Sequence, residues 1–161
     1  MSTRFTSHVA LPDETKAALV ETLNVVLATT IDLKSQVKQA HWNIKGPQFF
    51  ARHELFDKVA IKLRGFADRI AERATTLGGY AEGTVRLSVE VSKLPEYELR
   101  AVDGKQHIHA LVERFSAYTA FVRGAIKEAE AKNDPVTADL YTEILQGTEL
   151  DMWFLESHLN V

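Results

Sequence analysis

Apolar residues recur at helical spacing over four long stretches of this chain, and residues that break helices are rare. The chain has 161 residues, and its eight glycines and four prolines cluster at a few places. The spacing predicts helices over residues 12–43, about 48–77, about 105–132 and from 135 almost to the end. Four long helices with one long connection predict an all-α four-helix bundle of up-down, crossover, up-down type.

The helix boundaries follow from turn and capping residues. Pro12 suits a first helical turn, and Gly78-Gly79 ends the second predicted helix. Asn133-Asp134-Pro135 predicts a turn, an N-cap and the first residue of the last helix. Residues 80–103 lack a clear pattern and leave room for a short strand or helix. We therefore predict a short N-terminal tail at 1–11 and a single bundle domain at 12–161.

Composition limits the chemistry and the location. The chain has six histidines and no cysteine, which excludes a disulfide scaffold, a thiolate zinc site and an iron–sulfur cluster, so nitrogen and oxygen must hold any metal. The net charge of −3 is too balanced to favour a polyanion as main partner. No signal peptide and no apolar run of about 18 residues is present, so we expect a cytoplasmic protein.

The second predicted helix carries four side chains of metal-ligand type: His53, Asp57, Asp68 and Glu72. At about 100° per residue, these four fall within one arc of about 100°, away from the apolar stripe. Several neighbours on or beside this arc are small and leave it open: Ala60, Gly65, Ala71 and Thr75. Arg64 is a large exception. A polar stripe beside small residues favours the close approach of another helix.

The distances along this helix exclude one metal site built by the four residues together. Asp57 and Asp68 are eleven residues apart, or about 16 Å at the rise of an α-helix, whereas ligands must converge to bonds near 2 Å. Two copies of the helix, antiparallel across a two-fold axis near Lys62 and Leu63, would place His53 and Asp57 of one subunit opposite Asp68 and Glu72 of the other. The hypothesis is a pair of metal sites shared across a homodimer interface.

Two other interpretations of this face remain open from spacing alone. Charges at this spacing are commonly a solvated helix face, and Arg64, Arg69 and Arg73 are available as partners. His53-Glu54-x-x-Asp57 is similar to a zinc-protease helix, but its second histidine is replaced, which removes a ligand.

Two separated motifs resemble the signatures of the Dps family, the miniferritins of the ferritin-like superfamily. The first is His41-Trp42-Asn43-Ile44-Lys45-Gly46-Pro47-Gln48-Phe49, and the second is Asp68-Arg69-Ile70-Ala71-Glu72-Arg73 followed by Leu77-Gly78. The resemblance covers residues 12–160. It implies a ferritin-like bundle with a short helix in the central crossover, and a hollow shell of twelve subunits.

The resemblance also implies roles for individual residues. His41, His53 and Asp57 match the ferroxidase ligands from one subunit, and Asp68 and Glu72 match those from its two-fold partner. Family members oxidise Fe(II), preferentially with hydrogen peroxide, and store the ferric mineral inside the shell, which protects against oxidative damage. Zinc would bind the same ligands and inhibit. Trp42, next to His41 in the sequence, is a candidate to intercept a radical, although packing at the interface explains an aromatic residue there equally well.

An acidic entry pore is a further expectation from the resemblance. Asp134, Asp139 and Glu143 resemble the acidic residues that line the three-fold pores of the family, where negative charge attracts cations. Asp134 is also the predicted N-cap before Pro135, and Asp139 and Glu143 would equally suit a solvent-exposed face.

DNA binding is expected to be weak. Many members of the family compact DNA through a lysine-rich tail. The residues before Pro12 include only one arginine, Arg4, and one histidine, His8, and no basic segment is expected after the last helix. Lysine and arginine supply most non-specific affinity for phosphate. The alternatives to a ferroxidase shell are a mainly DNA-compacting structural member with weak ferroxidase activity, and a helical interaction protein whose metal ligands have no catalytic role.

Overall fold

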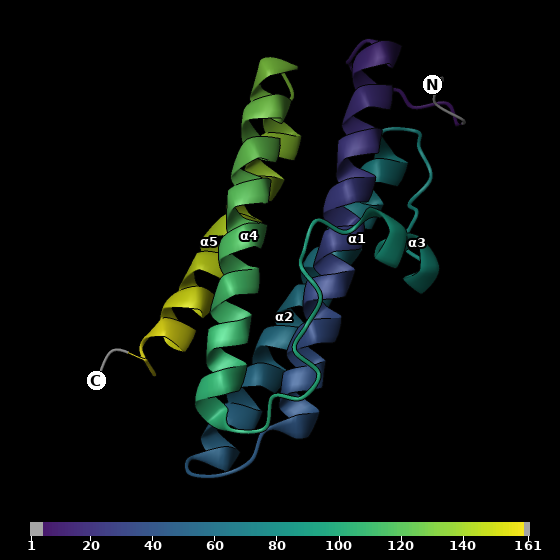
Figure 1. Cartoon of the computed structure of the whole chain (residues 1–161). Coiled ribbons are helices and arrows are strands. Elements are labelled where there is room, and N and C mark those ends of the chain that lie inside the picture. Colours follow the sequence, from purple (N-terminus) through teal and green to yellow (C-terminus); the bar gives the residue numbers. More distant parts are fainter. Residues whose placement is uncertain (1–4, 160–161) are drawn as a thin grey trace.

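The computed structural model describes residues 5–159 and contains five helices in that range. Four long helices, α1 (Asp13–Asn43), α2 (Phe49–Thr76), α4 (Gly104–Ala131) and α5 (Pro135–Glu156), form the bundle, and the short α3 (Val85–Val91) lies in the crossover. The helices α1 and α2 pack as one hairpin, α4 and α5 as the other, and α3 rests beside α1 (Figure 1). The prediction of an all-α ferritin-like bundle with a short crossover helix is confirmed.

Apolar side chains from all four long helices form one continuous core. The buried stripe of α2 includes Phe56, Leu63 and Ile70, which are fully buried and meet Leu23 of α1 and Phe115 of α4 in the same cluster. The predicted stripe of α2 therefore faces the core, because residues three and four apart share one side of a helix. On α5 the prediction is wrong for Leu150, Trp153 and Phe154, which are exposed, whereas Leu140 and Ile144 are buried.

The helix ends differ slightly from the predicted ones. The first helix begins at Asp13 with Pro12 as its N-cap, so Pro12 is not helical. The second helix starts after Gln48, which adopts a left-handed conformation with φ of 60°. The fourth begins one residue early, at Gly104, because the Asp103 carboxylate caps it and Gln106 completes a capping box. The predicted N-cap of the last helix is confirmed, since the Asp134 side chain accepts from the backbone N–H of Thr137.

Gly78 and Gly79 close α2 for two different reasons. Gly78 has a φ of 86°, a conformation that residues with a side chain rarely adopt. Gly79 lies against α1, where an added Cβ would come within 2.3 Å of a Val20 methyl carbon. The sequence prediction that this pair ends the helix is confirmed, and the second glycine also permits close packing.

The segment before α1 packs against the end of α2. The backbone N–H of Phe5 donates to the Gly78 carbonyl, and the Ser7 hydroxyl donates to the Thr76 carbonyl. Arg4, the basic residue of the predicted tail, lies outside the described residues, as do Asn160 and Val161 at the other end. The division into a tail at 1–11 and a bundle at 12–161 stays a prediction.

Candidate metal centre

His41 and His53 hold each other in place where the α1–α2 hairpin closes. Nδ1 of each ring lies 2.9 Å from the backbone carbonyl oxygen of the other residue, and the rings stack with centroids 3.7 Å apart. Because a carbonyl oxygen only accepts, each Nδ1 must carry a proton and donate it. In the neutral rings, both Nε2 atoms therefore keep a free lone pair. A hydrogen bond from the other ring nitrogen to a backbone carbonyl is the contact that orients histidines as metal ligands.

Asp57, one turn further along α2, completes this half of the candidate centre. Its Oδ1 atom lies 3.9 Å from Nε2 of His41 and 2.7 Å from Nζ of Lys38. The hydrogen bond and charge of Lys38 hold the pKa of Asp57 below its ordinary value, against the smaller opposing effect of burial. The carboxylate is therefore ionised at neutral pH, and a metal ion at this position must compete with the Lys38 ammonium.

Asp68 and Glu72 lie further along α2 and are exposed, and neither carboxylate has a hydrogen bond or ion pair within residues 5–159. Within the same range, no three histidine or acidic side chains are placed to hold a metal ion by themselves. The chain thus brings His41, His53 and Asp57 together and leaves Asp68 and Glu72 apart from them.

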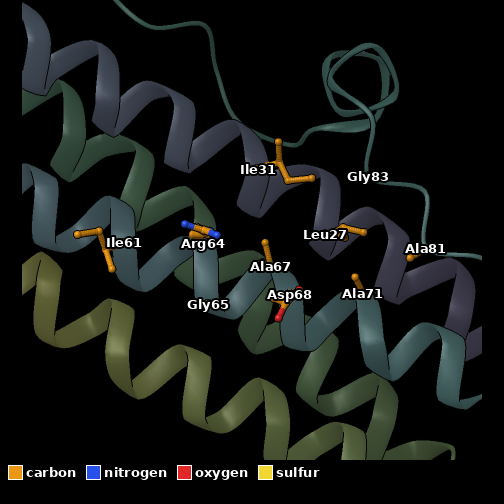
Figure 2. A pocket seen from close by; sticks show the side chains of 10 residues that line it. All are labelled: Leu27, Ile31, Ile61, Arg64, Gly65, Ala67, Asp68, Ala71, Ala81 and Gly83. Atoms are coloured by element: carbon orange, nitrogen blue, oxygen red, sulfur yellow. The ribbon is translucent and has the colours of Figure 1, made fainter.

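Asp68 borders a cavity of about 550 Å³ on the outer face of α2. The cavity lies between α1 and α2 and reaches the loop after α2, so its walls come from three segments (Figure 2). Its lining residues are Leu27, Ile31, Ile61, Arg64, Gly65, Ala67, Asp68, Ala71, Ala81 and Gly83. The small residues keep this face open, as the helical wheel predicts.

Three residues of this region correct or extend the sequence interpretation. Ile61 belongs to the ligand arc, at about 80° from His53, and was overlooked there; it is 64% exposed. Ala60, assigned to the open arc, is instead buried in the core. Lys38 was missed as a neighbour of Asp57, although its place three residues before His41 puts it on the same side of α1.

Trp42 is 64% exposed beside this half of the centre. The Lys38 ammonium lies 5.6 Å from the centre of its ring, and the same ammonium donates to Asp57. The role of Trp42, radical interception or interface packing, stays a prediction.

The three residues expected at a pore have different surroundings. Asp134 is buried, accepts from the Thr137 backbone and side chain, and pairs with Arg73 at 2.9 Å. Asp139 is exposed. The Glu143 carboxylate accepts a bidentate pair of hydrogen bonds from the Arg69 guanidinium, at 2.5 and 2.6 Å. The N-cap role of Asp134 is confirmed, whereas the pore role stays a prediction for all three.

These features define the class of the protein as a ferritin-like bundle, and the family model for the ferritin-like domain matches residues 20–161. The chain belongs to the Dps family of miniferritins.

Individual relatives agree with this assignment. The DNA protection during starvation protein of Agrobacterium fabrum is 40% identical over 149 residues, which cover 92% of each chain. DpsA14 from Streptomyces coelicolor matches with a TM-score of 0.94 at 32% identity, over 99% of this chain and 95% of that one. Dps of Mycobacterium smegmatis in its tetragonal form matches with a TM-score of 0.93 at 29% identity, over 97% and 94%. Family membership supports iron storage and DNA protection as the general function.

A membrane-spanning helix is not found within residues 5–159, because none of the helices there is both long enough and apolar enough. A cytoplasmic location stays a prediction.

Proposed function

We propose that this protein oxidises Fe(II), preferentially with hydrogen peroxide, at centres shared between two subunits, and stores the ferric product in a hollow shell of twelve subunits. The observation that carries the proposal is the division of the ligands. Two histidines with free Nε2 lone pairs and an ionised Asp57 lie at one end of α2, and two unpaired carboxylates lie on the same helix about 16 Å away. A second copy of the chain brings the two halves together.

An antiparallel second α2 satisfies the spacing of both halves at once. If Asp57 of one copy lies opposite Asp68 of the other, the same register places His53 opposite Glu72. Exposed Ile61 lies between the two half-sites and supplies apolar surface for this contact. The cavity beside Asp68 leaves room there for residues of the second copy.

The ligand set suits iron as substrate. Neutral imidazoles and carboxylates bind Fe(II), and carboxylate oxygens hold the harder Fe(III) product more strongly. Each peroxide takes up two electrons, one from each of two Fe(II) ions, and leaves as two hydroxide ions. The residues of the chain would bind and orient the ions, and exposed Trp42, next to His41 in the sequence, would intercept a stray radical.

Asp139 and Glu143 are the proposed entry residues for iron. Both are exposed near the start of α5, and negative charge at a pore would raise the local concentration of cations. Arg69 holds Glu143 in the isolated chain, so an entering cation would compete with it. Asp134 is less suited to this task, because its carboxylate is already bound by Arg73 and Thr137.

Iron oxidation tests the proposed function. We expect the purified protein to oxidise added Fe(II) much faster with hydrogen peroxide than buffer does, when ferric product is followed by its ultraviolet absorbance. Zn(II) added first should slow the reaction, because it takes the same nitrogen and oxygen ligands. Light scattering on the same sample should give the mass of twelve chains. Oxidation no faster than in buffer would contradict the ferroxidase proposal.

A second function, DNA compaction, is favoured by the relatives that are named DNA protection during starvation proteins. The net charge of −3 means that the cations able to bind phosphate are outnumbered by acidic groups that repel it. In a gel-shift assay at low salt, we expect no retardation of linear DNA by the assembled protein. Retardation that disappears at higher salt would instead support an electrostatic DNA-binding role.

A further inference from the structure

Tyr97 and His107 form a hydrogen-bonded pair that the proposed metal centre does not use. Tyr97 belongs to the crossover segment after α3, and His107 lies in the first turn of α4. The Tyr97 hydroxyl lies 2.7 Å from Nδ1 of His107, and the two residues are only 6% and 1% exposed. Water is therefore excluded from the bond between a phenol and an imidazole.

The direction of this hydrogen bond follows from the two groups. Burial raises the pKa of Tyr97, so the phenol keeps its proton. Burial also lowers the pKa of His107, against a smaller opposing effect of the Asn43 backbone, so the imidazole is neutral. With its proton on Nε2, which has no hydrogen-bond partner within residues 5–159, the ring leaves Nδ1 as the base. Tyr97 then donates to His107, because the opposite tautomer would leave the buried phenolic O–H without an acceptor.

The two other fully buried tyrosines lack a base. The Tyr118 hydroxyl lies 2.7 Å from the hydroxyl of Thr30, and among residues 5–159 the Tyr141 hydroxyl finds no hydrogen-bond partner. An alcohol is too weak a base to take up the proton that a phenol releases when it is oxidised, whereas an imidazole takes it up. Among these three buried phenols, only Tyr97 is placed to lose an electron and a proton together.

Arg114 makes this coupling necessary. Its guanidinium carbon lies 5.7 Å from the centre of the Tyr97 ring, and its Nη atoms bond the backbone carbonyl groups of Ala110 and Glu96. A fixed positive charge close to the ring opposes formation of a phenol radical cation. Electron loss from Tyr97 is then favourable only if the proton leaves as well.

We propose that Tyr97 and His107 form a one-electron redox site that accepts oxidising equivalents from hydroxyl radical or a comparably strong one-electron oxidant. In this step the oxidant takes one electron from Tyr97, so that hydroxyl radical becomes hydroxide, and the phenolic O–H proton passes to Nδ1 of His107. The products are a neutral tyrosyl radical and an imidazolium. The site removes a diffusing radical and holds the unpaired electron on the buried Tyr97 ring.

The location links this pair to the candidate metal centre. His107 faces the backbone of Asn43, at the end of α1 that also carries His41 and Trp42. Fe(II) and hydrogen peroxide that react incompletely there would generate the oxidant nearby. This source of oxidant rests on the proposed function, whereas the redox chemistry of the pair does not.

The test generates the oxidant with and without iron. In the iron-free arm, photo-excited ruthenium tris-bipyridine with persulfate oxidises the full-length protein, and rapid freezing with electron paramagnetic resonance detects tyrosyl radical. Every sample carries Tyr80→Phe, because Tyr80 is 46% exposed and would be oxidised directly. We expect the signal in the otherwise wild-type protein and in Tyr118→Phe, and its loss in Tyr97→Phe. His107→Gln should also lose it, because an amide oxygen keeps the hydrogen bond but takes up no proton.

The outcomes separate the two proposals. Signal in Tyr97→Phe equal to the wild type, or a signal in His107→Gln that is undiminished, would overturn the redox assignment, provided that circular dichroism shows each variant folded. The second arm uses Fe(II) and hydrogen peroxide. A Tyr97 radical in the iron-free arm alone would keep the redox pair and count against the metal centre as its source of oxidant.

Discussion

Two inactive variants of this protein are expected to regain activity when they share a shell. The first variant, His53→Ala with Asp57→Ala, removes one half of the ligands, and the second, Asp68→Ala with Glu72→Ala, removes the other half. Each alone should lose at least about 100-fold in peroxide-dependent Fe(II) oxidation, since even outer-shell changes at metal sites cost 10–100-fold. In a mixed dimer, the intact half of each chain meets the intact half of the other, which restores one of the two centres.

The expected recovery is quantitative. If the two variants are unfolded, mixed in equal amounts and refolded, half of the dimers are mixed and half of their centres are intact, which gives about one quarter of wild-type activity. Glu130→Ala, an exposed acid on α4, is the matched control and should keep full activity.

Other outcomes would locate the centre differently. Refolded mixtures that stay inactive would mean that the ligands do not combine across subunits. Activity that survives in either single variant would mean that these residues are not the ligands. Simple mixing without refolding should restore nothing, because assembled dimers do not exchange their chains during the assay.

Local pattern predicts the bundle and the ligand-bearing face well. The apolar periodicity of α2 determines which side enters the core, so the opposite side, with Asp57, Asp68 and Glu72, follows from the same arithmetic. Chemical breaks such as Gly78 and the Asp134 cap place the helix ends to within a residue or two. These features are properties of neighbouring residues and need no tertiary contact.

Contacts between distant segments determine the partners of the ligand side chains, which the local sequence pattern does not predict. The crossed bonds of His41 and His53 exist only when the α1–α2 hairpin closes, and Lys38 reaches Asp57 across the same hairpin. The carboxylate of Asp134 is taken by Arg73, which is 61 residues away in the chain. The spacing along one helix predicts which side chains share a face. Whether a carboxylate on that face is free to bind a metal ion depends on partners from another helix, which the spacing does not show.

Asp134→Ala is expected to be the most destabilising of the acidic substitutions near the proposed pore. The variant loses the N-cap of α5 and leaves the guanidinium of Arg73, which is only 12% exposed, without its partner. Breaking a buried ion pair from one side costs about 3–5 kcal/mol. Urea unfolding followed by circular dichroism, at one protein concentration for all samples, measures the loss.

The effect should depend on pH in a defined direction. Burial opposes ionisation of Asp134, but the hydrogen bonds from Thr137 and Arg73 outweigh it and hold its pKa below the ordinary value. The stabilisation is therefore complete above the pKa of an unfolded aspartate, about 3.9, and is lost as the pH falls through the lower native pKa. The difference in free energy of unfolding between wild type and variant should shrink toward the acid end.

Asp139→Asn separates a structural acid from a pore acid on the same helix. Asp139 is exposed, so its substitution should leave the unfolding free energy within about 0.5 kcal/mol of the wild type. If it lines the entry path, the variant should slow Fe(II) oxidation at low iron and approach the wild-type rate when iron is saturating, because only delivery is impaired. A loss of iron delivery in Asp134→Asn without a loss of stability would reverse the two roles, since asparagine keeps an N-cap oxygen but removes the charge that pairs with Arg73.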